Sequence, residues 1–308
     1  MNLALRSRLE LLGAAAIFST GGAAIKATTL TSWQVASFRS GIAAIAVLAL
    51  VPASRRGWSW RTLVVGATYA ATLTLFVLAN KLTTSANAIF LQAAAPLYLL
   101  LLGPWLLKEP LRRRDLGFAA VVGLGLACFF IGTEPPVRTA PDPVRGNVMA
   151  ALSGISWAFT LLGLRWLGSA AASTGKPAAA DSSTAVAAVA AGNLIAWGAT
   201  LPAALPVVGA TPVDWATLLY LGAVQIGLAY VLLTRGIRHV PALEASLLLM
   251  LEPVLNPVWA WVIHGERPGA WALAGGAAIL GATLVKTWVD ARGAGVAGGP
   301  APFRVAGE

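Results

Sequence analysis

Apolar stretches of about twenty residues follow one another along the chain, and short stretches that contain the charged residues separate them. A helix needs about twenty residues to cross the hydrocarbon core of a membrane, because it rises 1.5 Å per residue. No segment shows the alternation of apolar and polar positions, about ten residues long, that is typical of a membrane barrel. The pattern therefore predicts an all-α membrane protein.

The apolar runs between charges predict ten transmembrane helices. The first five cover Leu9–Lys26, Trp33–Val51, Thr62–Leu82, Ala86–Leu107 and Leu116–Ile131. The second five cover Gly146–Leu167, Ser183–Pro206, Trp215–Ile237, Ala242–Ile263 and Gly269–Val289.

The two groups of five predicted helices are similar to each other in sequence. A shift of 157 residues places Pro96 on Pro253, and it places helices four and five on helices nine and ten without a gap. A shift of 139 residues aligns Gly13–Lys26 with Leu152–Arg165. The chain is therefore expected to contain two five-helix repeats, residues 1–133 and 146–290, with a linker at 134–145 and a flexible tail at 291–308.

The difference between the two shifts requires an insertion in the second repeat. The stretch from Gly168 to Ser183 is small and polar, which is typical of a flexible loop. We therefore expect a loop there.

The loops predict that the two repeats have opposite orientations in the membrane. Five is an odd number, so the second repeat must enter the membrane from the other side. The first copy of one loop, Leu106–Arg114, carries three consecutive arginines, whereas its second copy, Val262–Ala270, carries one arginine. The positive-inside rule places the basic copy and both termini in the cytoplasm. Six of the 22 Lys and Arg then fall outside: Lys26, Arg39, Lys81, Arg138, Arg145 and Arg267.

The composition supports a membrane protein and argues against nucleic-acid binding. The chain is 57% apolar and 11% charged, with a mean hydropathy of +0.75, whereas soluble domains carry roughly a quarter charged residues. The net charge is +10, but the cations stand singly or in small clusters between apolar runs. No basic face or nucleic-acid motif accompanies them. The expected partners are the lipid bilayer and a small molecule.

The chemistry-bearing residues argue against catalysis. The chain has two histidines, His239 and His264, near the ends of different helices, and one cysteine, Cys128, within an apolar run. The sequence shows no metal cluster, phosphate loop or histidine box. We therefore expect no metal, no cofactor and no enzymatic activity, with an intramembrane enzyme as a distant alternative.

Several short segments resemble a known family. They are SFRSG at Ser37–Gly41, LLLMLEPVLNPVWAWVIHGE at Leu247–Glu266, and in each repeat a proline about thirteen residues before a helix-ending glutamate. On these features, and over almost the whole chain, the sequence resembles the EamA-type transporters of the drug/metabolite transporter superfamily, and it is similar to the YddG-type exporters of aromatic and other amino acids.

The resemblance implies a transporter of the bacterial inner membrane that exports amino acids and related amphipathic metabolites by alternating access. It also implies that helices one, three, four, six, eight and nine surround the substrate. A sugar-phosphate or nucleotide-sugar carrier of the same fold is the alternative. That carrier needs cations inside the cavity, and we expect Lys26, Arg39 and Lys81 near the outer helix ends instead. The oligomeric state is left open, and a monomer fits the sequence.

The candidate substrate site lies at mid-depth, where inverted repeats meet. Helical spacing groups polar and aromatic side chains on inner faces, and the repeat places Phe18 opposite Trp157. The candidates, each with packing as the competing interpretation, are Phe18, Tyr69, Thr72, Phe76, Asn80, Gln92, Ser153, Trp157, Thr160 and Gln225. The same spacing turns Tyr98 and Tyr230 away from the site.

Three further residues carry a mechanical or coupling hypothesis. Glu252 is a carboxylate at mid-membrane, which is costly without a partner, a proton or water. It is a candidate for proton coupling or for a structural role that caps the backbone next to Pro253. Pro96 and Pro253 each remove a helical hydrogen bond, so they are candidate hinges or static kinks.

Overall fold

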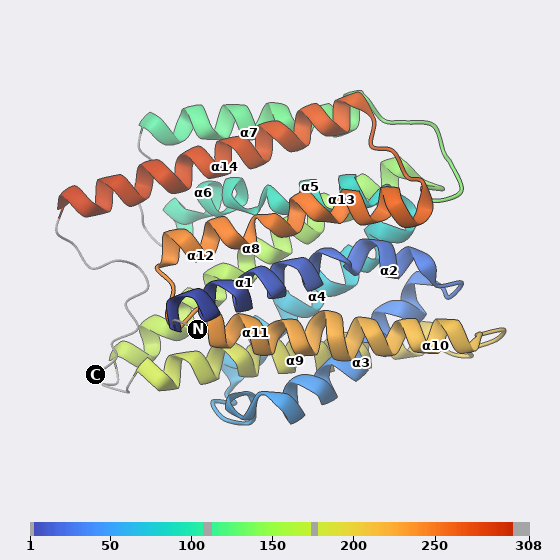
Figure 1. Cartoon of the computed structure of the whole chain (residues 1–308), viewed down its shortest axis with the longest axis horizontal. Coiled ribbons are helices and arrows are strands. Elements are labelled where there is room, and N and C mark those ends of the chain that lie inside the picture. The colour runs from blue at the N-terminus through green and yellow to red at the C-terminus, as the bar shows by residue number, and fades with distance from the viewer. Residues whose placement is uncertain (1–2, 107–112, 174–177, 298–308) are drawn as a thin grey trace.

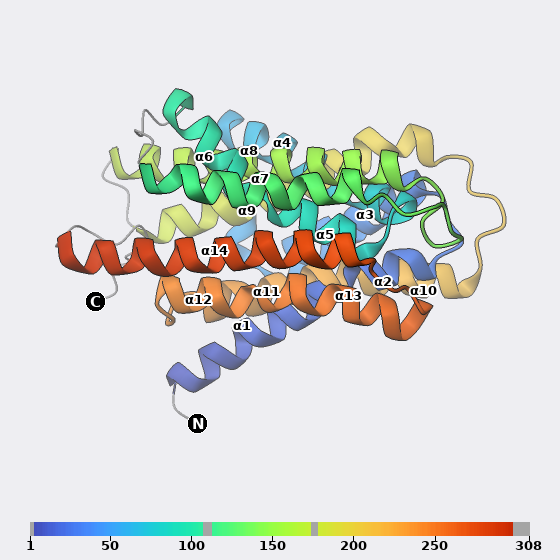
Figure 2. The ribbon, with the colours of Figure 1, turned by 90° about the horizontal axis from the view of Figure 1, so that it is seen from above.

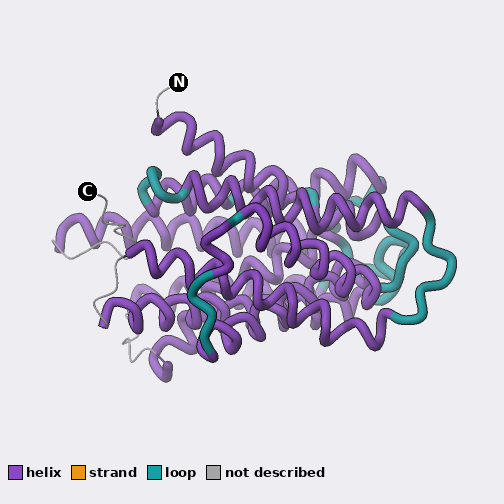
Figure 3. Tube along the Cα trace, turned by 90° about the horizontal axis from the view of Figure 1, so that it is seen from below, coloured by secondary structure: helices purple, strands orange, loops and turns teal. Residues whose placement is uncertain are grey.

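The computed structural model describes residues 3–106, 113–173 and 178–297. The described chain is helical, with a single isolated bridge between Val137 and Ala140 and no strand (Figure 3). Nine segments within these ranges are long and apolar enough to cross a membrane, and a shorter apolar helix covers Asp115–Ile131. The prediction of an all-α membrane protein is confirmed, while the number of ten spans stays a prediction.

The described residues of the first repeat form seven α-helices and one 3₁₀ turn. They are α1 (Leu3–Ser19), α2 (Gly21–Ala27), α3 (Ser32–Leu50), η1 (Pro52–Arg55), α4 (Trp60–Leu82), α5 (Ser85–Ala93), α6 (Ala95–Leu106) and α7 (Arg113–Ile131). The basic loop expected before α7 lies mostly outside the described residues.

In the second repeat, the part of the chain that the structure describes forms seven α-helices and one π-helix. They are α8 (Pro143–Ser173), α9 (Ala178–Ala204), α10 (Pro212–Leu219), the π-helix η2 (Tyr220–Leu228), α11 (Ala229–Gly236), α12 (Ala242–Leu249), α13 (Leu251–His264) and α14 (Ala270–Ala297).

All long helices run roughly along one direction, so the bundle has two ends (Figures 1 and 2). We call the end where α1 begins and α14 finishes the terminal end, on the left of Figure 1, and the opposite end, where α2 leads to α3, the distal end. Since α1 and α14 have their outer termini at one end, the chain crosses the bundle an even number of times.

Hydroxyl side chains start the helices at the distal end. The Thr31 hydroxyl accepts a hydrogen bond from the Gln34 amide, and the Gln34 side chain accepts one from the Thr31 amide. These two bonds form a capping box at the start of α3. Thr211 and Asp214 form a second capping box at the start of α10, and Thr84 accepts from the Asn87 amide at the start of α5. These bonds satisfy amide groups that the first turn of a helix leaves without a partner.

Predicted helices one, four and nine are each broken in two. The breaks fall at Thr20, at Ala94 and at Met250. Pro96 and Pro253 follow the last two breaks within the first turn of the next helix, where a missing N–H costs nothing. The two prolines therefore stand at matching discontinuities in the two repeats.

Helices of one repeat pack on helices of the other. The main seams join α4 to α8 and α9, α3 to α9, and α7 to α14, and Figures 1 and 2 show α7 and α14 side by side. Glycine allows the closest approach: a Cβ on Gly66 of α4 would lie 2.9 Å from the Cβ of Ala191 on α9. The two repeats therefore share one packed interior.

Small residues one turn apart, Ala119 with Gly123 and Ala277 with Gly281, predict close packing of α7 and α14. A Cβ at Gly123 or Gly281, however, would meet nothing within 4 Å. The contact is made instead by Gly125 and Gly275, where a Cβ on Gly275 would lie 2.6 Å from the Gly125 carbonyl oxygen. A small-residue pattern identifies the helices that pack but does not choose between faces.

Two segments expected to be flexible are helical in their described residues. The insertion after Gly168 continues α8 to Ser173 and starts α9 at Ala178, with residues 174–177 outside the described part. The tail expected from residue 291 continues α14 to Ala297, and residues 298–308 are not described. Alanine dominates both stretches, and its high helix propensity outweighs the turn signals.

Candidate functional site

Four aromatic side chains form a continuous row through the middle of the bundle. The ring of Phe18 stands edge-on to that of Tyr230, with centroids 5.4 Å apart. The hydroxyls of Tyr230 and Tyr69 are hydrogen-bonded at 2.9 Å, and Tyr69 lies 6.1 Å from Trp157, ring centre to centre. We call these four residues the aromatic row. Its members alternate between the repeats, on α1, α11, α4 and α8.

The aromatic row corrects one expectation. Phe18 and Trp157, which the repeat places opposite each other, lie at the two ends of the row with the two tyrosines between them. Tyr230, which helical spacing turned away from the site, is a central member. The π-helix η2 explains this error: its i→i+5 bonds bring residues five apart, such as Gln225 and Tyr230, toward one face.

The expected polar residues on α4, α5 and α8 meet one another. Gln92 donates to the Ser153 hydroxyl at 2.8 Å, and Ser153 donates to the Thr72 carbonyl at 3.1 Å. The hydroxyl of Thr160 lies 3.1 Å from that of Thr68. These bonds satisfy the side chains within the protein, so the residues form a polar seam between the two repeats beside the aromatic row.

The remaining sequence candidates are buried in helix packing. Gln225 donates to the Phe18 carbonyl at 3.0 Å, which ties η2 to α1. Phe76 belongs to the main apolar core. Asn80 is fully buried, donates to the Phe76 carbonyl at 2.9 Å and accepts from the Ser85 hydroxyl at 3.1 Å.

Arg39 lies in a different place from that expected. It stands near the middle of α3 rather than at an outer end, and it is only 4% exposed. Its Nε and Nη1 atoms have no hydrogen-bond partner among the described residues. An arginine in a membrane protein is expected to have a partner, so this guanidinium is a second charged candidate beside Glu252.

Glu252 also lacks a described partner. It is the second residue of α13, directly after the break at Met250, and its side chain makes no hydrogen bond or ion pair within the described ranges. The backbone-capping role expected for it therefore has no support.

Charged side chains from both repeats meet at the distal end. Lys26 and Glu266 form an ion pair at 3.6 Å, with side chains 3% and 4% exposed. Lys26 also donates to the carbonyls of Thr83 and Thr139, and Glu266 accepts from the Ser85 amide at 2.8 Å. Burial raises the pKa of Glu266, and Lys26 opposes this rise.

Lys81 and Asp214 also form hydrogen bonds at the distal end. Lys81 donates to the Thr28 carbonyl at 2.7 Å, and Asp214 accepts from the amide and hydroxyl of Thr29 at 2.7 and 2.8 Å. We call Lys26, Lys81, Asp214 and Glu266 the distal network. It joins residues that are far apart in sequence, so it ties segments of both repeats together at the distal end.

Two hollows lie near the distal network. A polar one of about 330 Å³ is lined by Lys26, Ala27, Thr28, Thr29, Asn80, Lys81, Arg138, Thr139 and His264. An apolar groove of about 580 Å³ is lined by Thr20, Ala23, Ala24, Ala27, Val213, Ala216, Thr217, Tyr220, Trp259 and Ile263.

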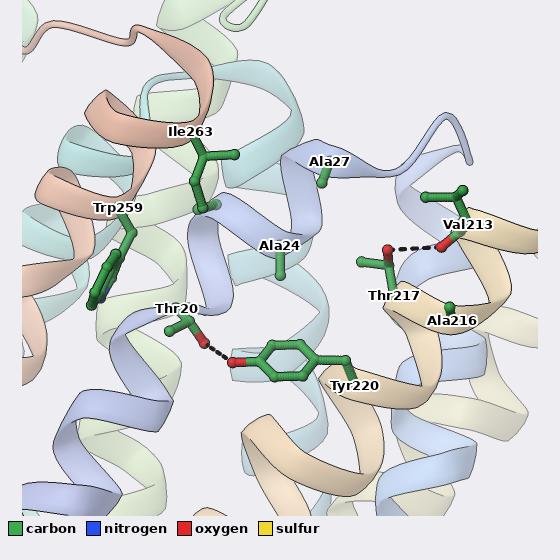
Figure 4. Close-up of a pocket in the computed structure, with 10 residues that line it drawn as sticks. Thr20, Ala24, Ala27, Val213, Ala216, Thr217, Tyr220, Trp259 and Ile263 are labelled. Carbon is green, nitrogen blue, oxygen red and sulfur yellow. Dashed lines mark hydrogen bonds between the residues drawn. The ribbon is translucent and has the colours of Figure 1, made fainter.

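The apolar groove contains residues that the sequence did not single out. Figure 4 shows the Tyr220 ring crossing the groove to Thr20, and the two hydroxyls are 2.8 Å apart. Trp259 donates to the Ser19 hydroxyl at 2.9 Å on the other wall. Thr20 is at the break between α1 and α2, which no proline or charge marks in the sequence.

The comparisons with known proteins agree with this architecture. The family model described as "EamA-like transporter family" matches residues 8–131 and 144–288, one match for each repeat. No curated protein matches the sequence. One solved structure, described as "Crystal structure of protein", shares the fold with a TM-score of 0.58 and 20% identity, over 92% of this chain and 98% of the other.

The family match covers both five-helix repeats, and the described spans are those of an integral membrane protein. The chain belongs to the EamA-like transporter family of the drug/metabolite transporter superfamily and is a membrane transporter.

Proposed function

We propose that the protein exports amino acids, aromatic ones included, and related small amphipathic metabolites from the cytoplasm of a bacterium. The aromatic row carries this proposal. Phe18, Tyr230, Tyr69 and Trp157 offer ring faces and two hydroxyls at mid-bundle, from both repeats. Aromatic side chains with a polar atom suit a guest that is part apolar and part polar.

The same arrangement supports alternating access. The distal network joins the two repeats at one end, so outward release requires Lys26 and Glu266 to separate. The helix breaks at Ala94 and Met250 are the points where α5 and α6, and α12 and α13, can change their relative angle. Pro96 and Pro253, next to these breaks, are the proposed hinges.

The first test is transport by the pure protein. Proteoliposomes are expected to take up labelled Phe, Trp or Thr. Trp157→Ala is expected to reduce uptake of Phe and Trp by roughly tenfold, because the aromatic row loses one of its four rings. Trp33→Ala is the matched control, since Trp33 is exposed near the distal end of α3 and should leave uptake unchanged. Absence of uptake across a broad amino-acid panel contradicts the proposal.

Glu252 remains the candidate for proton coupling. Under proton antiport, an imposed pH gradient is expected to stimulate uptake by the parent protein, and Glu252→Gln is expected to lose the stimulation because an amide carries no exchangeable carboxyl proton. Equal uptake with and without the gradient in the parent indicates passive facilitation. The measurement is the initial rate in vesicles of matched protein content.

The position of Arg39 favours a second candidate function. A buried mid-bundle cation is what a carrier of phosphorylated sugars needs, and the sequence interpretation placed that cation elsewhere. Lys26 and Lys81, however, are engaged in the distal network. Competition of Phe uptake by sugar phosphates, absent under the first proposal, distinguishes the two.

A further inference from the structure

We infer that the polar hollow at the distal end binds the carboxylate of the exported substrate as it leaves, through Lys81 and Arg138. The hollow has a volume of about 330 Å³, and none of its described lining residues belongs to the aromatic row. It is therefore a second site, and the predicted orientation places it on the outer side of the membrane. The inference rests on the proposed function, since it takes the substrate to be an amino acid.

The linker between the two repeats forms one wall of the hollow. This linker joins α7 to α8 at the distal end (Figure 1). Val137 and Ala140 exchange backbone hydrogen bonds of 3.0 and 2.9 Å, so Arg138 and Thr139 are at the tip of a tight turn. Both tip residues line the hollow, together with residues near the ends of α2, α4 and α13. The hollow is thus built from both repeats and from the segment that joins them.

Hydrogen bonds hold the turn in place. Lys26 donates to the Thr139 carbonyl, and the Asp142 amide donates to the Leu82 carbonyl at 3.0 Å. The turn is therefore attached to the last residues of α2 and α4. These bonds keep the backbone of Arg138 beside the hollow, while its exposed side chain can reach a ligand.

The lining of the hollow is rich in positive charge. Four of the nine described lining residues are basic, and none is acidic. The basic ones are Lys26, Lys81, Arg138 and His264. Two carboxylates of the distal network contact lining residues: Glu266 pairs with Lys26, and Asp214 accepts from Thr29. The three Lys and Arg side chains exceed these two carboxylates by one charge, so a singly charged anion would balance the hollow.

Lys81 and Arg138 have donors that the described residues do not use. An ammonium group has three N–H donors, and that of Lys81 bonds to the carbonyl and the hydroxyl of Thr28, at 2.7 and 2.9 Å. One donor therefore remains. Within the described ranges the Arg138 side chain makes no hydrogen bond or ion pair. A guanidinium can donate two parallel bonds to one carboxylate, which gives orientation as well as affinity.

The exposure of the hollow suits a site of release. Arg138 is exposed and Lys81 is half-buried, and exposed charge pairs contribute little to affinity. We therefore expect a dissociation constant of roughly 1 mM or weaker for a single carboxylate. A much tighter site would retain the substrate after it has left the aromatic row.

The binding test uses acetate, which has a carboxylate but no ring for the aromatic row. With the parent protein purified in detergent, acetate at about ten times its Kd is expected to raise Tm by roughly 2 °C or more, compared with chloride at the same ionic strength. Acetamide has a similar shape without the charge and is expected to leave Tm unchanged. Inorganic phosphate and short-chain phosphatidylglycerol test other sources of an anion. Tighter binding of either than of acetate would assign the hollow to phosphate or to a lipid headgroup and would overturn the inference.

Variants then locate the site. Arg138→Gln removes a side chain without a described partner, so the variant is expected to fold, and it is expected to weaken acetate binding roughly threefold or more. Adding Lys81→Gln is expected to bring the loss to roughly tenfold. Arg145→Gln is the matched control, because Arg145 is an exposed arginine at the same end that pairs with Asp142 and does not line the hollow.

Transport connects the hollow to export. In proteoliposomes, Arg138→Gln is expected to raise the concentration of external Phe that half-saturates uptake by roughly threefold, and to leave the maximal rate unchanged. The reason is that Phe entering from the outer side meets this hollow first. Arg145→Gln is expected to match the parent protein.

Two results overturn the inference alone. One is an effect of acetate no larger than that of acetamide or chloride in the parent protein, and the other is unchanged acetate binding in Arg138→Gln and in the double variant. If acetate binds as expected but the parent protein transports no amino acid, the proposed function and the exit role fall while the anion site remains. The two failures are therefore distinguishable.

Discussion

Replacing Glu266 by Ala is expected to lower the free energy of unfolding by about 3–5 kcal/mol, because it leaves the Lys26 ammonium buried without its counter-charge. Lys26 and Glu266 are each almost completely buried and come from different repeats. The Lys26 bonds to the carbonyls of Thr83 and Thr139 remain, but they do not neutralise its charge. Reversible unfolding in detergent measures the change.

Two further variants make this expectation specific. Lys26→Met combined with Glu266→Leu removes both charges and is expected to recover most of the loss, since an apolar pair of similar volume often replaces a buried ion pair without cost. Glu10→Ala removes an ion pair with Arg6, whose side chain is 59% exposed, and is expected to cost under about 1 kcal/mol. A Glu266→Ala protein as stable as the parent would show that Lys26 takes no support from this pair.

Replacing Gly275 by Val is expected to cost about 1–3 kcal/mol and to separate α14 from α7. Even the first carbon of the new side chain would lie 2.6 Å from the Gly125 carbonyl oxygen and 2.7 Å from the Phe129 ring. The backbone oxygen cannot move without moving α7, so the helices themselves must shift. Thermal unfolding of the purified protein measures the loss.

Gly281→Val is the matched control for this substitution. Gly281 is on the same helix, but a Cβ there meets nothing within 4 Å. The substitution is therefore expected to change stability by less than about 1 kcal/mol, mostly through helix propensity. Equal destabilisation by both substitutions would show that the crossing of α7 and α14 is not as close as described.

The broad architecture could be predicted because few kinds of protein structure can span a bilayer. Apolar length predicts spans, and the match of Pro96 with Pro253 predicts the repeat. The prediction of a loop after Gly168 was wrong. It considered only the small and polar residues of this stretch and not the helices on either side, α8 and α9, which extend into it.

The candidate site was predicted in part. Phe18, Tyr69 and Trp157 all belong to the aromatic row. They could be predicted because the symmetry of the repeats and the depth of a residue in the membrane can both be estimated from the sequence. Tyr230 was missed since the sequence does not reveal the π-helix that turns it inward. Arg39 was misplaced because a cation at that distance from a loop was assumed to be at the helix end.

The seams between the repeats have a consequence for how the chain is made. Gly66 of α4 packs on Ala191 of α9, and α7 packs on α14, so surfaces of the first half are completed only by helices from the second. During synthesis α4 and α7 are made before α9 and α14, so these faces of the first half have no partner until the second half is made. The seams between the repeats therefore form only after α9 and α14 have been synthesised.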